Sequence, residues 1–217
     1  MSRLYIPIKN GKKSIIPDFS NVRTISGNRV LYYLFYQNSY LKGSISFPVL
    51  TSVRAFSGMF YIFSNCSGVK KLLFPSLITL EGSNVLSGGA AFCTNLEEVD
   101  FSKLEKIDGS HAVDSLFYGC TSLKTVSFNK LNSVIGGSVF YRTFYNSGIK
   151  NIYFNAFTSD KAQDNITNLT EYMLQSTRGC TVHFPSNLQA VISSYHAVTV
   201  GFGGTNTTIL FDLPATS

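Results

Sequence analysis

Three cysteines at a fixed interval are the first residues that suggest chemistry. Cys66, Cys93 and Cys120 are 27 residues apart. In a stack of coils they would lie about 4.8 Å apart, the distance between neighbouring strands, which could admit a disulfide or a soft metal ion. Neighbouring coils point their Cβ atoms the same way, however, which is poor disulfide geometry. Ser39 and Ser147 continue the same column. We therefore interpret the column as small buried residues and predict no metal site.

Histidine and serine chemistry is sparse. Asp114 follows His111 by three residues, and with many serines present a hydrolytic triad can be drawn, but any serine-rich chain permits that. Gly201–Gly204 lacks the Lys-Ser/Thr and the following helix of a phosphate loop. No metal-binding spacing of the H-E-x-x-H or C-x-x-C kind exists. We predict that the protein is not an enzyme and uses no cofactor. The remaining histidines and the fourth cysteine stand in separate segments: His183, His196 and Cys180.

Aromatic residues are the stronger signal for binding. The chain has 18 Phe and 12 Tyr but no Trp. An exposed tyrosine offers a rigid, amphipathic surface to a protein or a glycan, whereas a buried one needs a partner for its hydroxyl. Many of these tyrosines serve packing alone. As part of a ligand-binding surface we predict five residues: Tyr36, Tyr61, Tyr118, Tyr141 and Arg142.

A column of lysines recurs with the same interval. Lys42, Lys70, Lys124 and Lys150 occupy it, with Glu97 in the middle. Such a stripe could meet an acidic glycan. We favour the interpretation that the position is simply exposed to solvent, because lysine also keeps sheet edges soluble.

These residues are positioned by an internal repeat. The chain returns to Phe every 26 to 28 residues from Phe19 to Phe154, and again at Phe184 after an insertion. Aliphatic residues follow three and six positions later, and a Phe precedes each Cys or Ser of the cysteine column. The columns are Phe19, Phe47, Phe74, Phe101, Phe128, Phe154; Val22, Leu50, Leu77, Leu104, Leu131; Ile25, Val53, Leu80, Ile107, Val134; and Phe35, Phe63, Phe92, Phe117, Phe144.

Each repeat predicts one coil of a solenoid. Alternation over Lys124–Phe128 indicates a short strand with one buried face. The next stretch has apolar residues three apart, which suggests a tight helical turn, and a Gly/Ser-rich segment such as Glu81–Gly89 returns the chain. One strand and one turn cannot bury their own apolar face, so at least three coils must stack, and the chain has roughly five or six.

Two phrases carry a resemblance to a known family. Phe117–Lys124 reads F-Y-G-C-T-S-L-K and Phe63–Lys70 reads F-S-N-C-S-G-V-K. Both are similar to the aromatic-x-x-Cys-x-x-Leu phrase of the BspA-like leucine-rich repeats, over about residues 15–155. The resemblance implies a right-handed superhelix of short parallel strands, and a non-catalytic protein of bacterial surfaces or phages that binds an extracellular ligand.

The ends of the array differ from the repeat. The spacing of Ile166, Leu169 and Met173 predicts a helix. We expect Ser159 or Asp160 to be its N-cap and Gly179 to mark its end. Ser186–Gln189 matches a capping box before a second helix. Val198–Phe202 and Ile209–Phe211 alternate and predict an antiparallel hairpin.

We expect an N-terminal cap strand over residues 1–14 whose Asn10–Gly11 turn forms another hairpin. The solenoid then spans 15–155, with about five coils of about 27 residues. A final coil and small α+β C-terminal cap occupy 156–217.

Charge and hydropathy argue against nucleic-acid binding and against membrane insertion. The net charge is +6, but the basic residues are scattered, so we predict no nucleic-acid binding. No apolar stretch of signal-peptide or membrane-span length appears, so we expect no membrane insertion. An extracellular, cell-surface or virion location follows from the resemblance.

Two functions remain open. The first is recognition of a protein or glycan ligand by an adhesin-like or phage receptor-binding protein. The alternative is a structural virion or assembly component that forms a homo-oligomer through the C-terminal cap.

Overall fold

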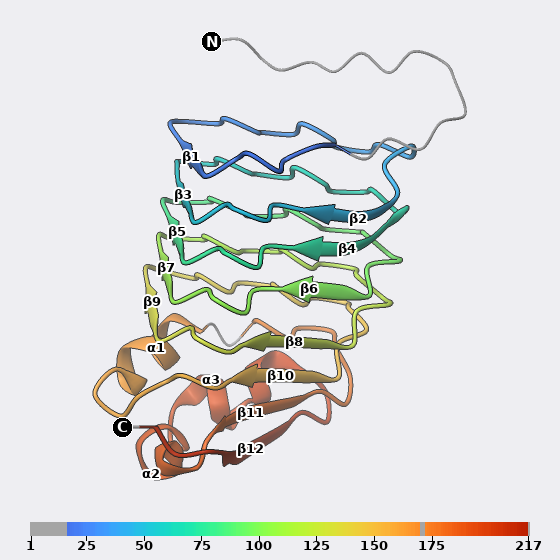
Figure 1. The fold of residues 1–217 in the computed structure, drawn as a ribbon. Coiled ribbons are helices and arrows are strands. Elements are labelled where there is room, and N and C mark those ends of the chain that lie inside the picture. Colours follow the sequence, from blue (N-terminus) through green and yellow to red (C-terminus); the bar gives the residue numbers. More distant parts are fainter. Residues whose placement is uncertain (1–16, 170–171, 217) are drawn as a thin grey trace.

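The structure is a computed structural model that describes residues 17–169 and 172–216. The chain winds through stacked coils, and three helices gather at the C-terminal end of the stack (Figure 1). The fold is the predicted solenoid of short parallel strands. The N-terminal strand and its hairpin, expected within residues 1–17, lie almost wholly outside the described residues.

One strand of each coil belongs to a long series on the front of the molecule in Figure 1. Every pairing in this series is parallel. It confirms the strand predicted over Lys124–Phe128, which begins at Thr125. The series comprises β2 (Gly43–Ser46), β4 (Val69–Leu73), β6 (Glu98–Asp100), β8 (Thr125–Phe128), β10 (Asn151–Phe154), β11 (Thr181–Pro185) and β12 (Thr208–Leu213).

A second strand per coil follows the predicted tight turn, in which the N–H groups of Leu77 and Leu104 donate to the carbonyls of Phe74 and Phe101 at 3.1 Å. After the Phe of each repeat the chain makes a short bend and then enters a three-residue strand with one central buried side chain. In register, Val53 pairs with Leu80, Leu80 with Ile107 and Ile107 with Val134, which reproduces the 27-residue step. The prediction included the turn but missed this strand, because so short a strand shows no alternation in sequence. The strands are β1 (Thr24–Ser26), β3 (Ser52–Arg54), β5 (Thr79–Glu81), β7 (Lys106–Asp108) and β9 (Ser133–Ile135).

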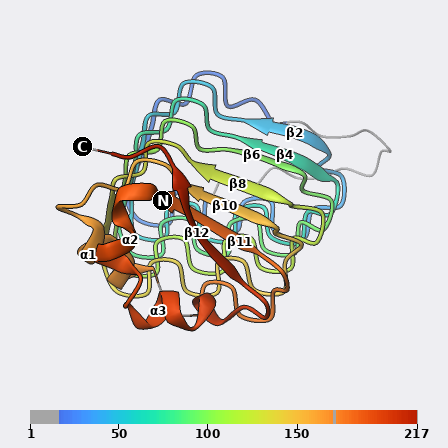
Figure 2. The same ribbon diagram turned by 90° about the horizontal axis from the view of Figure 1, so that it is seen from below.

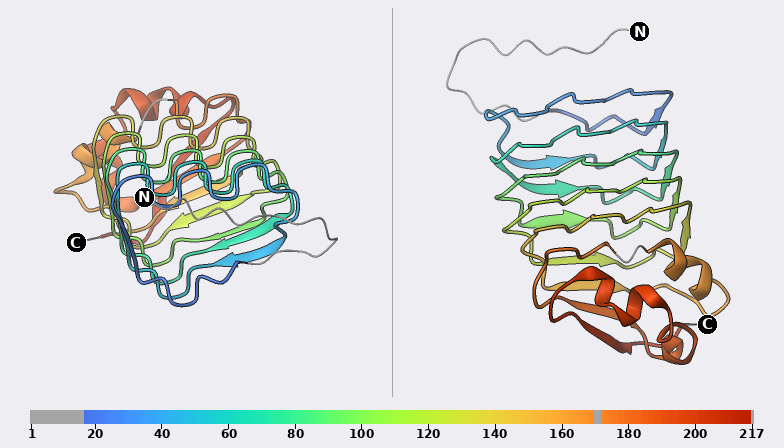
Figure 3. Two further views of the ribbon diagram at one scale, coloured as in Figure 1. Left: turned by 90° about the horizontal axis from the view of Figure 1, so that it is seen from above. Right: turned by 180° about the vertical axis from the view of Figure 1, so that it is seen from behind.

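The third side of each coil is an undulating return segment (Figure 3). Its residues run two outward and two inward: Asp114 and Ser115 are partly exposed, whereas Leu116 and Phe117 are buried. The second outward residue adopts positive φ, as at Ser115. Alternate N–H groups donate to the next coil, for example Ser115 to the Tyr141 carbonyl at 2.9 Å. The Gly/Ser-rich segments predicted as turns thus form hydrogen bonds between the backbones of neighbouring coils.

The core is a set of side-chain columns that follow the axis of the stack. The phenylalanine column is a ladder of parallel rings, with centroids 5.1 Å apart for Phe47 and Phe74 and 5.5 Å apart for Phe74 and Phe101. Leu50, Leu77 and the other leucines of their column are fully buried. Each coil buries its apolar residues within itself and against its two neighbours, as expected of a repeat array.

The insertion after β10 contains α1 (Ala162–Asn168), which is shorter than predicted. Its N-cap residue is Lys161, without a side-chain cap, so the expected capping by Ser159 or Asp160 is wrong. Asp160 instead accepts a hydrogen bond from the hydroxyl of Thr158. Met173 is buried but lies beyond the helix, and Gly179 ends no helix.

The C-terminal hairpin prediction was also wrong. The short helices α2 (Gln189–Ile192) and α3 (His196–Thr199) carry the chain across the end of the stack (Figure 2). A short 3-10 turn, Ser186–Leu188, precedes α2, and Ser186 forms no capping bond. The chain then returns to form β12, which pairs with β11 in parallel. Since Phe211 stacks on Phe184 with centroids 6.0 Å apart, the last strand continues the repeat.

Candidate functional site

The return segments form a face on which side chains of successive coils stack. Hydrogen bonds between coils align the outward-facing residue pairs of successive return segments into columns. One column contains the pairs 32/33, 60/61, 87/88, 114/115 and 141/142, and a second contains 36/37, 64/65, 91/92, 118/119 and 145/146. Aromatic rings stack along both. Tyr33 lies over Tyr61 with centroids 5.3 Å apart and planes 6° apart, and Tyr118 lies over Tyr145 at 4.6 Å and 11°.

The first of these columns is interrupted by small or polar residues. Tyr32–Tyr33 and Phe60–Tyr61 are followed by Ser87–Gly88 and Asp114–Ser115, and large side chains return at Tyr141–Arg142. A shallow hollow of about 540 Å³ results. We call it the trough, and its lining residues are Phe60, Tyr61, Asn84, Ser87, Ala91, Phe92, Asp114, Ser115, Tyr118, Tyr141 and Arg142.

Two glycines allow rings to fold into the trough wall. A Cβ atom at Gly88 would lie 2.6–2.8 Å from three ring atoms of Tyr61, and one at Gly119 would lie 2.8 Å from the ring of Phe92. Both glycines adopt positive φ. The Tyr61 and Phe92 rings can therefore lie where they do only because these two positions carry no side chain. Glycine also adopts the positive φ there without strain.

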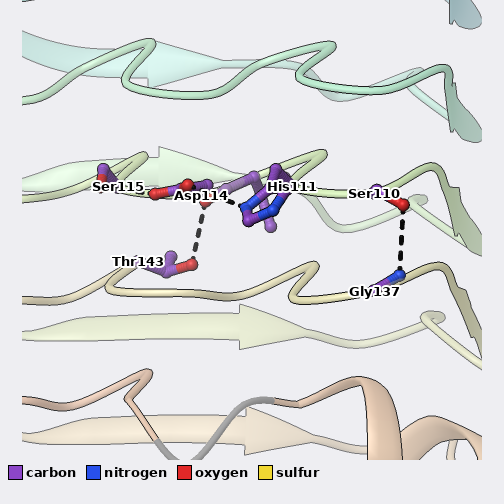
Figure 4. A network of polar contacts seen from close by, with 7 residues as sticks. Ser110, His111, Asp114, Ser115, Gly137 and Thr143 are labelled. Atoms are coloured by element: carbon purple, nitrogen blue, oxygen red, sulfur yellow. Dashed lines mark hydrogen bonds and ion pairs between the residues drawn. The ribbon is translucent and has the colours of Figure 1, made fainter.

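Asp114 is the anionic residue of the trough. Its carboxylate contacts the Nδ1 atom of His111 at 3.1 Å and accepts a hydrogen bond from the Ser115 hydroxyl at 2.6 Å (Figure 4). The carboxylate thus stands between the serine and the histidine. A nucleophilic triad needs the histidine between the other two, so that it can take the serine proton. These three residues therefore form a polar cluster and not a catalytic triad.

The polar cluster is tied to the next coil (Figure 4). The Thr143 hydroxyl donates to the Val113 carbonyl at 2.9 Å, and the Gly137 N–H donates to the Ser110 hydroxyl at 3.4 Å. These bonds hold the coil that carries Asp114 against the coil that carries Arg142.

Arg142 provides the cationic wall. Its guanidinium lies 4.9 Å from the centroid of the Tyr141 ring and 5.5 Å from that of Tyr145, within the range of cation–π attraction. Its Nε atom donates to the Gln175 side chain at 3.0 Å. The planar group is thereby held in one orientation.

Tyr61 keeps its proton at neutral pH. Burial raises the pKa of its phenol above the ordinary value of 10.0, and the negative charge of Asp114 raises it further. The Tyr61 hydroxyl is therefore a neutral hydrogen-bonding group in the trough.

The structure brings four of the five predicted binding residues together. Tyr61, Tyr118, Tyr141 and Arg142 line the trough. The fifth, Tyr36, lies outside it on the same face, with its ring 6.4 Å from that of Tyr61.

The other seven lining residues were not predicted as binding residues from the sequence: Phe60, Asn84, Ser87, Ala91, Phe92, Asp114 and Ser115. Phe92 was assigned to the buried phenylalanine column, but Ala90 occupies that place and Phe92 is 44% exposed. The signal was present, because Phe92 stands one residue before Cys93, whereas Phe63 and Phe117 stand three residues before their cysteines.

The cysteine column matches its interpretation as buried packing. Each thiol donates to a carbonyl of the preceding coil: Cys66 to Phe35 at 2.9 Å and Cys93 to Phe63 at 3.1 Å. Cys120 forms the same bond. All four cysteines, including Cys180, are free thiols. Within residues 17–169 and 172–216, no three or more His, Cys, Asp or Glu residues gather in a way that could hold a metal ion.

The lysine column is exposed to solvent, as expected. Lys70 faces Glu97 at 3.9 Å, and the ammonium group of Lys124 donates to the Thr121 carbonyl at 2.9 Å. None of the described helices is long and apolar enough to cross a bilayer.

A family model agrees with the repeat. The family model described as the BspA type leucine-rich repeat region matches residues 28–159 and 114–197, with six copies. The chain belongs to the BspA-type leucine-rich repeat family. It is also similar to the crystal structure of a leucine-rich repeat protein from Bacteroides ovatus ATCC 8483, with 16% identity and a TM-score of 0.28 over 88% of this chain and 76% of that one. No curated protein matches the chain. Membership of this repeat family agrees with a non-catalytic repeat protein.

Proposed function

We propose that this BspA-type repeat protein is a recognition protein, adhesin-like or phage receptor-binding, that contacts a protein or glycan through the trough. It would act outside the cell, on a cell surface or on a virion. The proposal rests on one observation: the repeat stacks aromatic side chains along the return face and then interrupts them with Gly88, Asp114 and Ser115.

The composition of the trough supports recognition. Tyrosine, phenylalanine and arginine are enriched where interfaces bind tightly, and tyrosine loses little conformational entropy on binding. The rings are held before any ligand arrives, since Tyr118 stacks on Tyr145 and Tyr61 on Tyr33. Pre-organised side chains lower the entropic cost of association.

The test is binding to an immobilised panel of cell-surface glycans and extracellular proteins, measured for the wild type and for Tyr118→Ala and Tyr141→Ala. We expect each variant to lose about tenfold or more in affinity for any partner bound, as for a central aromatic contact. Tyr40→Ala is the matched control, because Tyr40 is exposed but lies outside the trough. Binding that falls equally in the control, or no binding at all, would count against the proposal.

A structural role is the second candidate. The last strand, β12, pairs with β11 on one side, and no other described strand pairs with it. Its side chains alternate in exposure, and Leu210 is 38% exposed. An unpaired strand edge is a template for another chain. A stable oligomer by light scattering that Leu210→Lys dissociates would support assembly through the C-terminal coil, and a monomer at all concentrations would exclude it.

A further inference from the structure

The ring stacks of the return face stop part-way along the molecule. Tyr33 and Tyr61 continue one another, but the next two positions of that column are Gly88 and Ser115. The column resumes at Arg142, whose guanidinium lies against Tyr141 and Tyr145. Two successive coils, about 10 Å along the axis, thus lack a large side chain in this column.

The gap is bounded by flat groups on several sides. The ring of Tyr61 leans over Gly88, and the ring of Phe92 leans over Gly119. Phe92 and Tyr118 meet at 4.8 Å with planes 55° apart, which forms an angled side wall. The Tyr61 ring fills the place of a side chain at Gly88, so a ligand ring in the gap would replace the missing large side chain at Ser115.

The floor of the gap is polar. Asp114 uses one contact to His111 and one to Ser115. A carboxylate has about four lone-pair directions, so acceptor capacity remains for two more donors. Arg142 uses its Nε atom for Gln175, which leaves its terminal nitrogens to donate.

These features favour one class of ligand over a protein side chain. A phenylalanine side chain from a partner would stack in the gap but would offer Asp114 no donor, and a tyrosine or tryptophan would offer it only one, whereas leaving a buried polar group unsatisfied is costly. A pyranose sugar has C–H groups on its ring face and hydroxyl groups at its rim. It can therefore stack on Tyr61 or Phe92, donate to Asp114 and accept from Arg142.

We infer that the trough is a carbohydrate subsite in which a hexopyranose ring lies over Ser115, between Arg142 and the Tyr61 ring that covers Gly88, with its hydroxyls on Asp114 and Arg142. This inference rests on the proposed function and adds the chemical class of the ligand.

The experiment is an amide ¹H–¹⁵N NMR titration of the whole chain. One set of probes comprises the methyl glycosides of glucose, galactose, mannose and N-acetylglucosamine. The other comprises N-acetyltyrosinamide and N-acetyltryptophanamide. The amides of Gly88 and Gly119 report on the trough, since they donate to the Asp114 and Tyr145 carbonyls at 2.7 and 2.9 Å. The spectrum itself shows that each variant is folded.

We expect at least one glycoside to shift the Gly88 and Ser115 amides saturably, and Asp114→Asn to weaken that binding about tenfold, the effect of losing a charged hydrogen-bond partner. Tyr40→Ala should bind like the wild type.

Two results would overturn the inference, and they differ in what they leave standing. If only N-acetyltyrosinamide or N-acetyltryptophanamide shifts the amide resonances of the trough residues, the sugar assignment is wrong but recognition through the trough survives. The same conclusion follows if Asp114→Asn binds glycosides as well as the wild type does. If neither set of probes shifts the trough, and no panel partner does so either, the proposed function fails with it.

Discussion

At the scale of single residues, glycine is required where one coil meets the backbone of the next. A Cβ atom at Gly109 would lie 2.4 Å from the carbonyl carbon and oxygen of Gly82. Gly82 and Gly136 make the same close approach, to Ala55 and to Gly109. This column sets how closely the coils stack.

We predict that Gly109→Ala lowers the free energy of unfolding by about 2–3 kcal/mol, because its backbone conformation is strained for alanine and the neighbouring coil must shift. Gly137→Ala is the matched control, since a Cβ there would meet only the Ser110 hydroxyl, at 3.9 Å. Urea denaturation of both variants measures the difference. Equal stability of the two would contradict the close approach.

The buried thiols make a second prediction at this scale. Burial raises the pKa of Cys66 from 9.0 to about 11 and that of Cys120 to about 12. Because the thiol pKa is higher in the folded than in the unfolded state, the protonated thiols contribute their full share to the free energy of unfolding below about pH 9. This contribution is lost as the pH rises toward 11–12. Cys120→Ser, a residue that the column already contains at Ser147, should reduce this decline.

Thiol reactivity checks the same burial directly. At pH 8 the native protein should not react with Ellman's reagent, and all four thiols should react in denaturant, since the reactive species is the thiolate. Rapid reaction of any cysteine in the native state would show that the column is open.

At the scale of elements, α1 closes the sheet edge at β9. Asn165 accepts from the Val134 N–H at 2.9 Å and donates to the Asn132 carbonyl at 3.1 Å. Asn168 donates to the Val134 carbonyl at 2.7 Å. Two side-chain amides thus take the place of the next strand for the backbone groups of Asn132 and Val134.

We predict that Asn165→Ala costs about 2–3 kcal/mol of stability, because a buried N–H and a carbonyl lose their partner. Asn129→Ala, at an exposed asparagine, should change stability by less than about 0.5 kcal/mol. Thermal or urea unfolding of the pair tests this. A small effect at Asn165 would mean that water replaces the amide.

At the scale of the whole molecule, stability should vary along the stack. In a repeat array each coil contacts only its neighbours, and among the described residues the coil of β1 pairs with one other coil whereas the coil of β5 pairs with two. The return segments offer equivalent hydrogen bonds for comparison: Gly88, Ala90 and Phe92 donate to the next coil at 2.6–3.0 Å, and Arg29, Leu31 and Tyr33 at 2.7–3.0 Å.

We predict that native-state hydrogen exchange is at least about tenfold slower at Ala90 and Phe92 than at Leu31 and Tyr33, because local opening is easiest at the ends. Since the bond lengths match, a difference reports on the position in the stack. One common exchange rate would mean that the coils open as a single unit.

The sequence by itself determined the repeat, and with it the buried columns. Phe47, Phe74 and Phe101 recur at one step, and a step of that kind has a meaning only if the coils stack. It also pointed to Tyr61, Tyr118, Tyr141 and Arg142, since tyrosines outside the phenylalanine column had no evident place in the core. The hairpin was the avoidable error: Phe211 stands 27 residues after Phe184 and belongs to the same column.

Only the tertiary structure decided how the columns face one another. Whether Phe92 is buried depends on a register of two residues, which hydrogen bonds between coils set. The trough likewise exists because Gly88 and Ser115 fall in line with Tyr33, Tyr61 and Arg142, residues up to 109 positions apart in the chain. Their alignment is a property of stacking, which the propensity of any single segment does not encode.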